Sequence, residues 1–255
     1  MKGRLPLRDL VAHLDAYLDL ANVPDFPGAR NGLQVENAGT VSRIAACTDA
    51  CQATIDAAAE RGADFLLVHH GLFWGDGIQP LTDRSYRRVR TLLEAGIAVY
   101  SAHLPLDVHP EVGNNARLAR LLGMDVAGHF GEYEGCAIGV HGELDIARDD
   151  LARRLAKALG REPTVIATGP ERCRRVGIVT GGASSLIARA RDASLDTFVS
   201  GEGPHHSYFD AEEWGLNVLY AGHYATETLG VKALAEHLGA TFGLPWEFID
   251  HPTGL

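Results

Sequence analysis

The stretch Arg43-Ile-Ala-Ala-Cys-Thr48 is a strand-sized apolar run that recurs later in the chain as Arg175-Val-Gly-Ile-Val-Thr180. The two copies stay in register, at an offset of 132 residues and without a gap, as far as Gly71 and Gly203. Similarity at a fixed offset over such a length is typical of a duplicated unit. The stretch therefore predicts a fold of two related halves.

A helix-like segment precedes this stretch, and strand-like and helix-like segments alternate from Val41 onward. An amphipathic helical pattern runs from Leu7 to Leu18, and Pro24 and Pro27 prevent it from continuing. The alternation predicts an α/β fold of duplicated repeats, with mixed sheets and helical crossovers. The segments predicted after the opening helix are a strand at 41–47, a helix at 50–61, a strand at 64–69, a helix at 83–95 and a strand at 97–102.

A histidine followed four residues later by a carboxylate occurs in both halves. His103 and Asp107 follow the apolar run at 97–100, and His223 and Glu227 follow a matching run at an offset of 120 residues. Both pairs stand where a buried strand is predicted to end. The second repeat therefore reproduces the polar residues of the first as well as its apolar pattern.

The two predicted repeats also end alike. Gly123 and Gly239 each follow a helical segment and suit the left-handed position after a helix. We expect residues 1–255 to form a single compact unit of two intertwined halves, with the first repeat at about 41–123 and the second at about 173–239. Two unrelated α/β units would share the same alternation, so chance similarity is the alternative. If the halves are duplicates, their strand ends are expected to converge on one cleft, where α/β proteins commonly bind ligands.

The composition excludes several classes of protein. A formal net charge of −10 opposes general attraction to nucleic acid. The longest apolar runs are far below the roughly 20 residues of a membrane helix, and the N-terminus lacks the pattern of a signal peptide. The four cysteines form no C-x-x-C pair, so buried free thiols are expected rather than a zinc knuckle. These features together indicate a cytoplasmic globular protein.

His69 and His70 follow the apolar run Phe65-Leu-Leu-Val68 and precede Gly71. Within a continuing strand the two imidazoles would point apart, but a turn at Gly71 would let each ring meet a different metal ion. Neutral imidazole is the commonest protein metal ligand. Two adjacent histidines without further ligands more often make ordinary hydrogen bonds. The hypothesis of a metal site therefore depends on other ligands.

The two His-x-x-x-carboxylate motifs supply such ligands. Pro105 argues against a helix between His103 and Asp107, and we expect a loop that orients the Asp107 carboxylate. If a helix begins by residue 223, His223 and Glu227 lie on one face of it. Exposed pairs with this spacing also occur on ordinary helix surfaces, which is the alternative. His103 is a candidate catalytic residue through substrate contact or a hydrogen bond behind the ligands, and the alternative is a polar strand-end residue bonded to the backbone.

Glu202 is the second candidate catalytic residue. It aligns with His70 in the repeat and lies in the segment Ser200-Gly-Glu-Gly-Pro-His-His206. As a carboxylate at the same cleft, Glu202 could act as a general base or contact a substrate. A carboxylate that caps the next helix would look the same in the sequence.

Seven short motifs, taken in order, are specific to one family. They are Asn31-Gly-Leu-Gln-Val-Glu36, Val68-His-His-Gly71, His103-Leu-Pro-Leu-Asp107, Gly113-Asn-Asn-Ala-Arg-Leu-Ala119, Ser200-Gly-Glu202, Ala221-Gly-His-Tyr-Ala-Thr-Glu227 and Phe248-Ile-Asp250. Through them the chain resembles the dinuclear metal-centre protein family, whose members are often labelled GTP cyclohydrolase I type 2 homologs and include proteins similar to NGG-interacting factor.

The resemblance implies a dinuclear metal site and a homohexameric ring with the metal sites facing its cavity. His103 is not carried over as a firm ligand, and Tyr224 stands where some relatives have another histidine. Some relatives also carry an inserted domain, for which residues 124–172 leave little room, so the chain resembles the compact form. The ligand roles carried over by the resemblance fall on His69, His70, Asp107, His223 and Glu227.

Such ligands suit two divalent ions per chain, drawn from Zn, Fe, Mn, Ni or Co. Two ions at one site favour metal-assisted hydrolysis by an activated water. We therefore expect a metal-dependent hydrolase with a small-molecule substrate, cyclohydrolase-like on a nucleotide if the family label applies. The alternatives are a non-catalytic metal-binding, metal-delivery or assembly protein, and a structural metal site. The sequence has no G-x-x-x-x-G-K-[ST] motif for nucleotide binding. Only the family label therefore suggests a nucleotide substrate.

Overall fold

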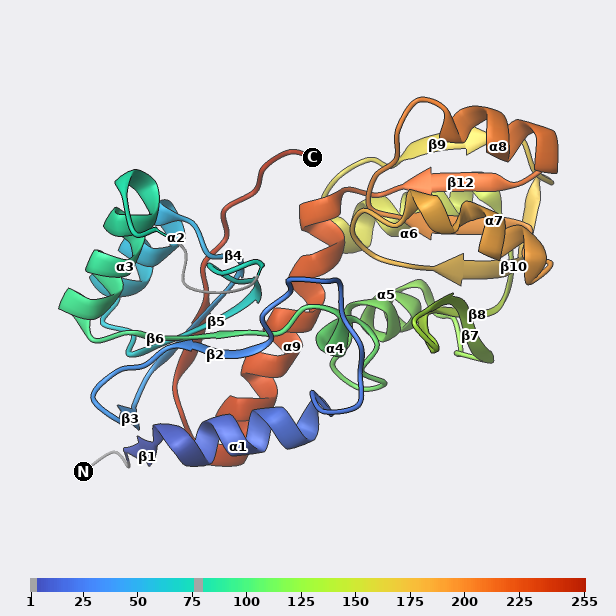
Figure 1. Cartoon of the computed structure of the whole chain (residues 1–255). Helices are drawn as coiled ribbons and strands as arrows, with labels where there is room; N and C mark the ends of the chain where they lie inside the picture. Colours follow the sequence, from blue (N-terminus) through green and yellow to red (C-terminus); the bar gives the residue numbers. More distant parts are fainter. Residues whose placement is uncertain (1–3, 76–79) are drawn as a thin grey trace. The chain divides into compact units, whose positions relative to one another are not determined.

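The computed structural model describes residues 4–75 and 80–255, and the chain folds into two compact units (Figure 1). The first unit contains residues 1–106 and 230–251, and the second contains residues 107–229 and 252–255. Each unit is a mixed sheet covered by helices, which confirms the predicted α/β class. The predicted duplication boundaries are not tested by this division and stay a prediction.

A five-stranded sheet forms the centre of the first unit, in the order β13-β4-β5-β6-β2. Strands β13, β4, β5 and β6 are parallel, and β2 is antiparallel to β6. A short two-stranded sheet pairs β1 with β3. The elements of this unit are β1 (Leu5–Pro6), α1 (Leu7–Tyr17), β2 (Gly32–Val35), β3 (Thr40–Val41), β4 (Ile44–Asp49), α2 (Gln52–Glu60), β5 (Phe65–His70), α3 (Asp83–Ala95), β6 (Ala98–Ser101) and β13 (Trp246–Phe248).

Alternate side chains of β4, β5 and β6 enter opposite sides of this sheet. Leu66 and Val99 belong to the apolar cluster that includes Ile55 of α2 and Leu92 of α3. On the other side, the hydroxyl of Tyr100 donates a hydrogen bond to Asp15 of α1 at 2.8 Å. Both sides are buried, which explains why these strands are apolar throughout.

A six-stranded sheet forms the second unit, in the order β7-β8-β10-β11-β12-β9. Strands β10, β11 and β12 are parallel, and their neighbours β8 and β9 are antiparallel to them. The elements that lie wholly in this unit are α5 (Asn114–Leu122), β7 (Gly128–Tyr133), β8 (Cys136–Ala147), α6 (Arg148–Leu159), β9 (Thr164–Ala167), β10 (Arg172–Ile178), η1 (Ser184–Leu186), α7 (Ile187–Asp192), β11 (Thr197–Ser200), α8 (Ser207–Trp214) and β12 (Asn217–Tyr220). Two helices have residues in both units, α4 (Leu104–Asp107) and α9 (His223–Phe242).

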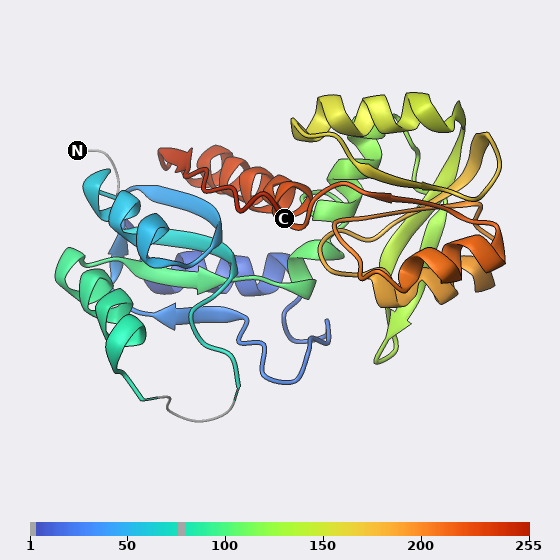
Figure 2. The same ribbon diagram turned by 90° about the horizontal axis from the view of Figure 1, so that it is seen from above.

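Helices cover both faces of this second sheet. Leu118 of α5 and Leu155 of α6 pack in one apolar cluster with Val176 and Val199 of the sheet. Figure 2 shows α6 on one side of the strands and α7 and α8 on the other. The stretch 124–172, predicted to be too short for an inserted domain, contributes β7, β8 and β9 to this sheet and α6 to its cover.

The two units repeat a three-stranded parallel motif joined by helices. In the first unit α2 and α3 connect β4, β5 and β6, and in the second α7 and α8 connect β10, β11 and β12. The repeat-related residues Asp64 and Asp196 also act alike. Asp64 accepts a hydrogen bond from the backbone N–H of Arg43 at 3.0 Å, and Asp196 accepts one from that of Arg175 at 2.9 Å.

Most predicted segments lie within a few residues of the observed ones, and the helix at 83–95 is α3. Two local predictions are wrong. Pro105 is the second residue of the short helix α4, where a proline needs no intrahelical N–H partner. Gly239 lies inside α9, which continues to Phe242, and Gly243 with a φ of 68° follows it.

The reason for Gly239 is close packing rather than helix termination. A Cβ atom at this residue would lie 2.6 Å from Cδ1 of Trp246 and 3.2 Å from the carbonyl oxygen of Leu244. Its predicted counterpart Gly123 does end α5, with a φ of 75°. The same residue type therefore serves two different local requirements.

Across the described parts of the chain, helices are too short or too polar to span a lipid bilayer. The four cysteines are free thiols, with Cys47 and Cys173 buried and Cys51 and Cys136 partly exposed. Burial raises the pKa of Cys47 to about 12, so this thiol stays protonated at neutral pH.

Candidate metal-binding groups

Three histidines of the first unit form what we call the imidazole cluster. His69 and His70 are the last two residues of β5, and His103 follows β6. One ring nitrogen of each lies within 4.8 Å of one ring nitrogen of the others. Ring centroids lie 4.7 Å apart for His69 and His70, 5.0 Å for His69 and His103, and 5.6 Å for His70 and His103. His69 is fully buried and His70 partly so.

Each imidazole of the cluster is held at Nδ1 by an oxygen atom of another segment. A carbonyl or ionised carboxylate oxygen only accepts hydrogen bonds, so Nδ1 carries the proton and the lone pair of the neutral ring is on Nε2. This is the arrangement that orients metal-ligating histidines. The pairs are His69 with the carbonyl of Ala102 at 2.8 Å, His70 with Asp49 at 2.8 Å, and His103 with Asp25 at 2.7 Å.

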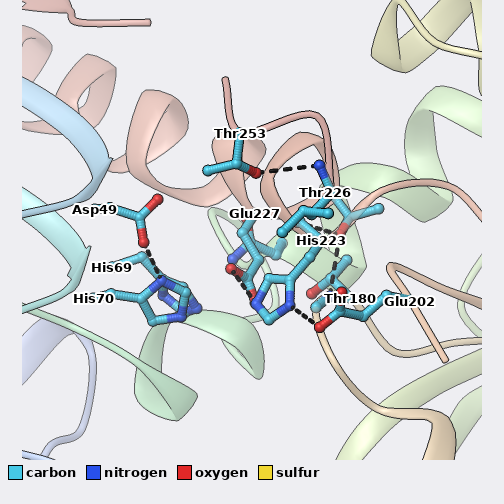
Figure 3. A network of polar contacts seen from close by, with 12 residues as sticks. Asp49, His69, His70, Thr180, Glu202, His223, Thr226, Glu227 and Thr253 are labelled. Atoms are coloured by element: carbon cyan, nitrogen blue, oxygen red, sulfur yellow. Dashed lines mark hydrogen bonds and ion pairs between the residues drawn. The ribbon is translucent and has the colours of Figure 1, made fainter. Parts of the chain in front are cut away.

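These contacts explain how consecutive strand residues can serve one cluster. β5 continues through His70, so a turn is not what brings the rings together. His69 reaches sideways to the segment after β6, and His70 reaches to Asp49 at the end of β4, on the other side of β5. Figure 3 shows Asp49 beside His70, with the His69 ring next to it.

Asp25 fixes His103 through a dense set of hydrogen bonds. Its side chain is 7% exposed, and it accepts from the Asn31 side chain at 2.7 Å and from the backbone N–H of Leu104 at 3.0 Å. Burial raises the pKa of Asp25, but the hydrogen bond and charge of His103, helped by Asn31 and Phe26, outweigh burial and hold that pKa below its usual value.

The Asp25→Asn variant is expected to lower the free energy of unfolding by about 1–3 kcal/mol, because an amide N–H then faces groups that already donate. Urea unfolding near neutral pH measures this loss. The matched control is Asp9→Asn, whose ion-pair partner Arg8 is 88% exposed, and no measurable change is expected there. Equal stability of Asp25→Asn and the control would show that the hydrogen bonds of Asp25 contribute nothing.

A second group lies at the start of α9, within the second unit. α9 begins at His223, as the predicted helix face requires, and the Nε2 atom of His223 lies 3.2 Å from Glu227. The Nδ1 atom lies 2.9 Å from Glu202, so the ring is flanked by two carboxylates (Figure 3). Glu227 is nearly buried, whereas the Glu202 side chain is 49% exposed.

The two carboxylates change the acidity of His223. The hydrogen bond with Glu227 raises its pKa most, burial opposes this, and the charges of Glu227 and Glu202 add to the increase, which brings the pKa to about 9. In the metal-free protein at neutral pH, His223 is therefore an imidazolium. A metal ion can bind its nitrogen only after the proton has left.

This raised pKa predicts a pH dependence of stability in the metal-free protein. The stabilisation from charged His223 is fully present below its unfolded-state pKa of 6.5 and is lost as pH rises to about 9. The difference in Tm between the wild type and His223→Gln should therefore shrink over this interval. Thermal scans of both chelator-treated proteins check it, and a difference that stays constant over the interval contradicts it.

Asp107 and Glu227 both contact the segment after β10. Asp107 is 8% exposed and accepts a hydrogen bond from Asn114 at 2.8 Å. The Thr180 hydroxyl lies 3.4 Å from the same carboxylate. The next residue, Gly181, has a φ of 70°, and a Cβ atom there would overlap a carboxylate oxygen of Glu227.

The repeat places different residues at corresponding points. Gly181 aligns with Asp49, so the second half has a glycine that admits Glu227 where the first half has the carboxylate that holds His70. Glu202 aligns with His70 and does not cap α8, whose N-cap is His206 without a side-chain bond. The contact of Glu202 with His223 was not predicted, since the alternatives were a general base, a substrate contact or a helix cap.

Several partners of these residues were not predicted. The neighbours of candidate ligands that were not predicted are Asp25, Asp49, Asn114, Thr180 and Gly181. The sequence contained a signal for the contact of Asp49 with His70, because each residue stands near the end of a predicted strand. These two strands, β4 and β5, are neighbours in the sheet. Asp25 carried no such signal, since its contact with His103 spans 78 residues of sequence.

The chain matches known proteins over nearly its whole length. The family model of Duf34/NIF3 (NGG1p interacting factor 3) matches residues 5–253. A GTP cyclohydrolase 1 type 2 homolog of Deinococcus radiodurans is 45% identical, with 100% of this chain and 96% of the relative covered. One of Pyrococcus horikoshii is 43% identical, with 97% and 98% covered.

Solved structures give the same result for the fold. A structure of protein ybgI, described as of unknown function, has a TM-score of 0.92 at 38% identity, with 98% of this chain and 100% of that one covered. TTHA1606 from Thermus thermophilus has a TM-score of 0.89 at 44% identity, with the same coverage. The predicted fold and family resemblance are confirmed.

Proposed function

Because the chain belongs to the Duf34/NIF3 family, we propose that it is a cytoplasmic metal-dependent hydrolase that holds two divalent ions per chain. The observation that carries this proposal is the imidazole cluster, whose three rings are each held at Nδ1 by an acceptor oxygen. The ligands we assign from the sequence motifs are His69 and His70 in the first unit, and Asp107, His223 and Glu227 in the second.

The chemistry of the donors fits such ions. Imidazole nitrogen and carboxylate oxygen together suit Zn, Fe, Mn, Ni or Co, and the described cysteines are too buried or too scattered to be required. Divalent ions bound in this way supply Lewis acidity, which lowers the pKa of a water molecule and polarises a substrate.

The remaining polar residues have defined tasks in this proposal. His103 keeps its proton at Nδ1 against Asp25, so its Nε2 atom is the one that accepts a proton during the reaction. Glu202 accepts the Nδ1 hydrogen of His223 and therefore acts through the orientation of that ring. Glu202 is in this proposal a positioning residue rather than a general base.

The relatives named GTP cyclohydrolase 1 type 2 homolog suggest the first substrate to test. Metal-loaded protein should open the guanine ring of GTP, which changes its ultraviolet absorbance, or should hydrolyse a member of a panel of phosphoesters and amides. The same protein after chelation should be inactive. Turnover that persists without metal excludes the proposed mechanism.

A second candidate function is non-catalytic metal binding or delivery. Glu202, whose carboxylate contacts His223, is 49% exposed. This exposure favours a bound metal ion that can exchange. Stable metal content without turnover on any substrate in the panel would support this candidate.

As the family resemblance implies, we also propose a homohexamer, for which light scattering should give six times the chain mass of 27.3 kDa.

A further inference from the structure

Two large exposed aromatic side chains border the imidazole cluster in the first unit. Trp74 is 42% exposed, and its ring centroid lies 5.3 Å from that of His103, with the two rings nearly perpendicular at 80°. Phe26 is 45% exposed, and its ring lies 5.7 Å from His103. Trp74 also lies 6.4 Å from the ring of His70.

The segments that carry these aromatics, residues 26–30 and 71–75, are bonded to each other. Ala29 and Trp74 form an antiparallel β-bridge, and the backbone N–H of Gly75 donates to the carbonyl of Gly28 at 2.7 Å. The Arg30 side chain donates to the carbonyl of Gly75 at 2.9 Å. The backbones of Gly28 and Gly75 approach each other closely. A Cβ atom on Gly28 would lie 2.8 Å from the nitrogen of Gly75.

Gln34 of β2 adds a further connection. Its side-chain oxygen accepts a hydrogen bond from the N–H of Leu72 at 2.7 Å, and its side-chain nitrogen donates to the carbonyl of Arg30 at 2.6 Å. A Cβ atom on Gly71 would overlap this amide. We call residues 26–30 and 71–75, with the exposed rings of Phe26 and Trp74, the aromatic rim.

Such a rim has the chemistry of a site for a flat ring. A scattered exposed aromatic needs no explanation, but here the ring centroids of Trp74 and Phe26 lie 5.3 Å and 5.7 Å from that of His103. The segments 26–30 and 71–75 that carry them are joined by side-chain and backbone hydrogen bonds. Aromatic side chains stack on nucleobases of any kind, because every base has a π-face. The Nε2 atom of His103, whose Nδ1 atom is held by Asp25, adds a polar acceptor that can orient a ring N–H or hydroxyl group.

We propose that Trp74 and Phe26 bind a planar heteroaromatic ring of the substrate beside the imidazole cluster. This inference rests on the proposed function and narrows its substrate class. Trp74 and Phe26 are binding residues in it and do not ligate metal. Loss of either aromatic face should therefore weaken ring binding and leave the metal content unchanged.

The test measures binding of GTP, ATP and inorganic triphosphate by calorimetry to wild type, Trp74→Leu and Phe26→Leu, all analysed for metal. Wild type should bind the two nucleotides at least tenfold more tightly than triphosphate, and each variant should lose about tenfold for the nucleotides alone. The matched control is Tyr86→Leu, which removes an aromatic ring that is 51% exposed on α3 and should change nothing.

The outcomes separate the two proposals. Metal-loaded wild type that binds nucleotides no better than triphosphate overturns the ring site and leaves the metal proposal standing. Equal losses in Tyr86→Leu and Trp74→Leu also overturn it, because they would report general apolar contact. A wild-type protein that contains no metal overturns the proposed function. If this metal-free protein still binds nucleotides and the binding depends on Trp74, the ring site is supported.

Discussion

The Gly181→Ala variant is expected to lose most of its bound metal and to unfold more readily than wild type. A methyl group at this position overlaps a carboxylate oxygen of Glu227, whose side chain is 5% exposed and has little room to move. The φ of 70° adds about 1–2 kcal/mol of backbone strain for any residue other than glycine. Metal analysis and urea unfolding measure the two effects.

Gly160→Ala separates overlap from backbone strain. Gly160 has a φ of 72°, and a Cβ atom there would have nothing within 4 Å. This variant should lose only the stability due to strain and should keep its metal. If Gly181→Ala matches Gly160→Ala in both measurements, the contact with Glu227 is irrelevant to metal binding.

The largest loss of metal is expected in Glu227→Gln and His69→Ala. Partners behind a ligand typically change metal affinity by 10–100-fold, so removal of a proposed ligand should exceed about 100-fold. His69 is fully buried, and its replacement by alanine also leaves a cavity. Glu227→Gln keeps the volume and removes the charge, so it reports metal binding without that complication.

These variants should also lose the stabilisation that metal gives to the folded state. At a free metal concentration about a thousandfold above Kd, that stabilisation is about 4 kcal/mol. The wild type should therefore unfold at lower urea after chelation, and Glu227→Gln should respond little. His129→Ala is the control, because His129 is an exposed histidine of β7 outside the candidate ligands. Equal metal content in Glu227→Gln and wild type would contradict the ligand assignment.

Much of the fold could be predicted because the buried strands are apolar on both faces. The run that became β5 and the helix α3 follow directly from hydrophobic pattern and length. Gly239 and Pro105 were misjudged because local propensity depends on context. One glycine is needed for packing against Trp246, and one proline is accommodated in the first turn of a helix.

The candidate site was predictable to the level of residue type and strand end. The sequence placed His69, His70 and His103 after parallel strands, and the structure brings their rings into one cluster. It did not show which nitrogen of each ring is engaged. That depends on Asp25, Asp49 and the carbonyl of Ala102, which are distant in sequence and become neighbours only through the tertiary fold.

The direct test of the central claim is the metal content of the purified wild-type protein, measured by elemental analysis under conditions that avoid adventitious metal. We expect about two divalent ions per chain. Protein that contains no metal, and that takes up none when Zn, Fe, Mn, Ni and Co are offered in turn, would contradict it and would leave the imidazole cluster as a set of hydrogen-bonded histidines.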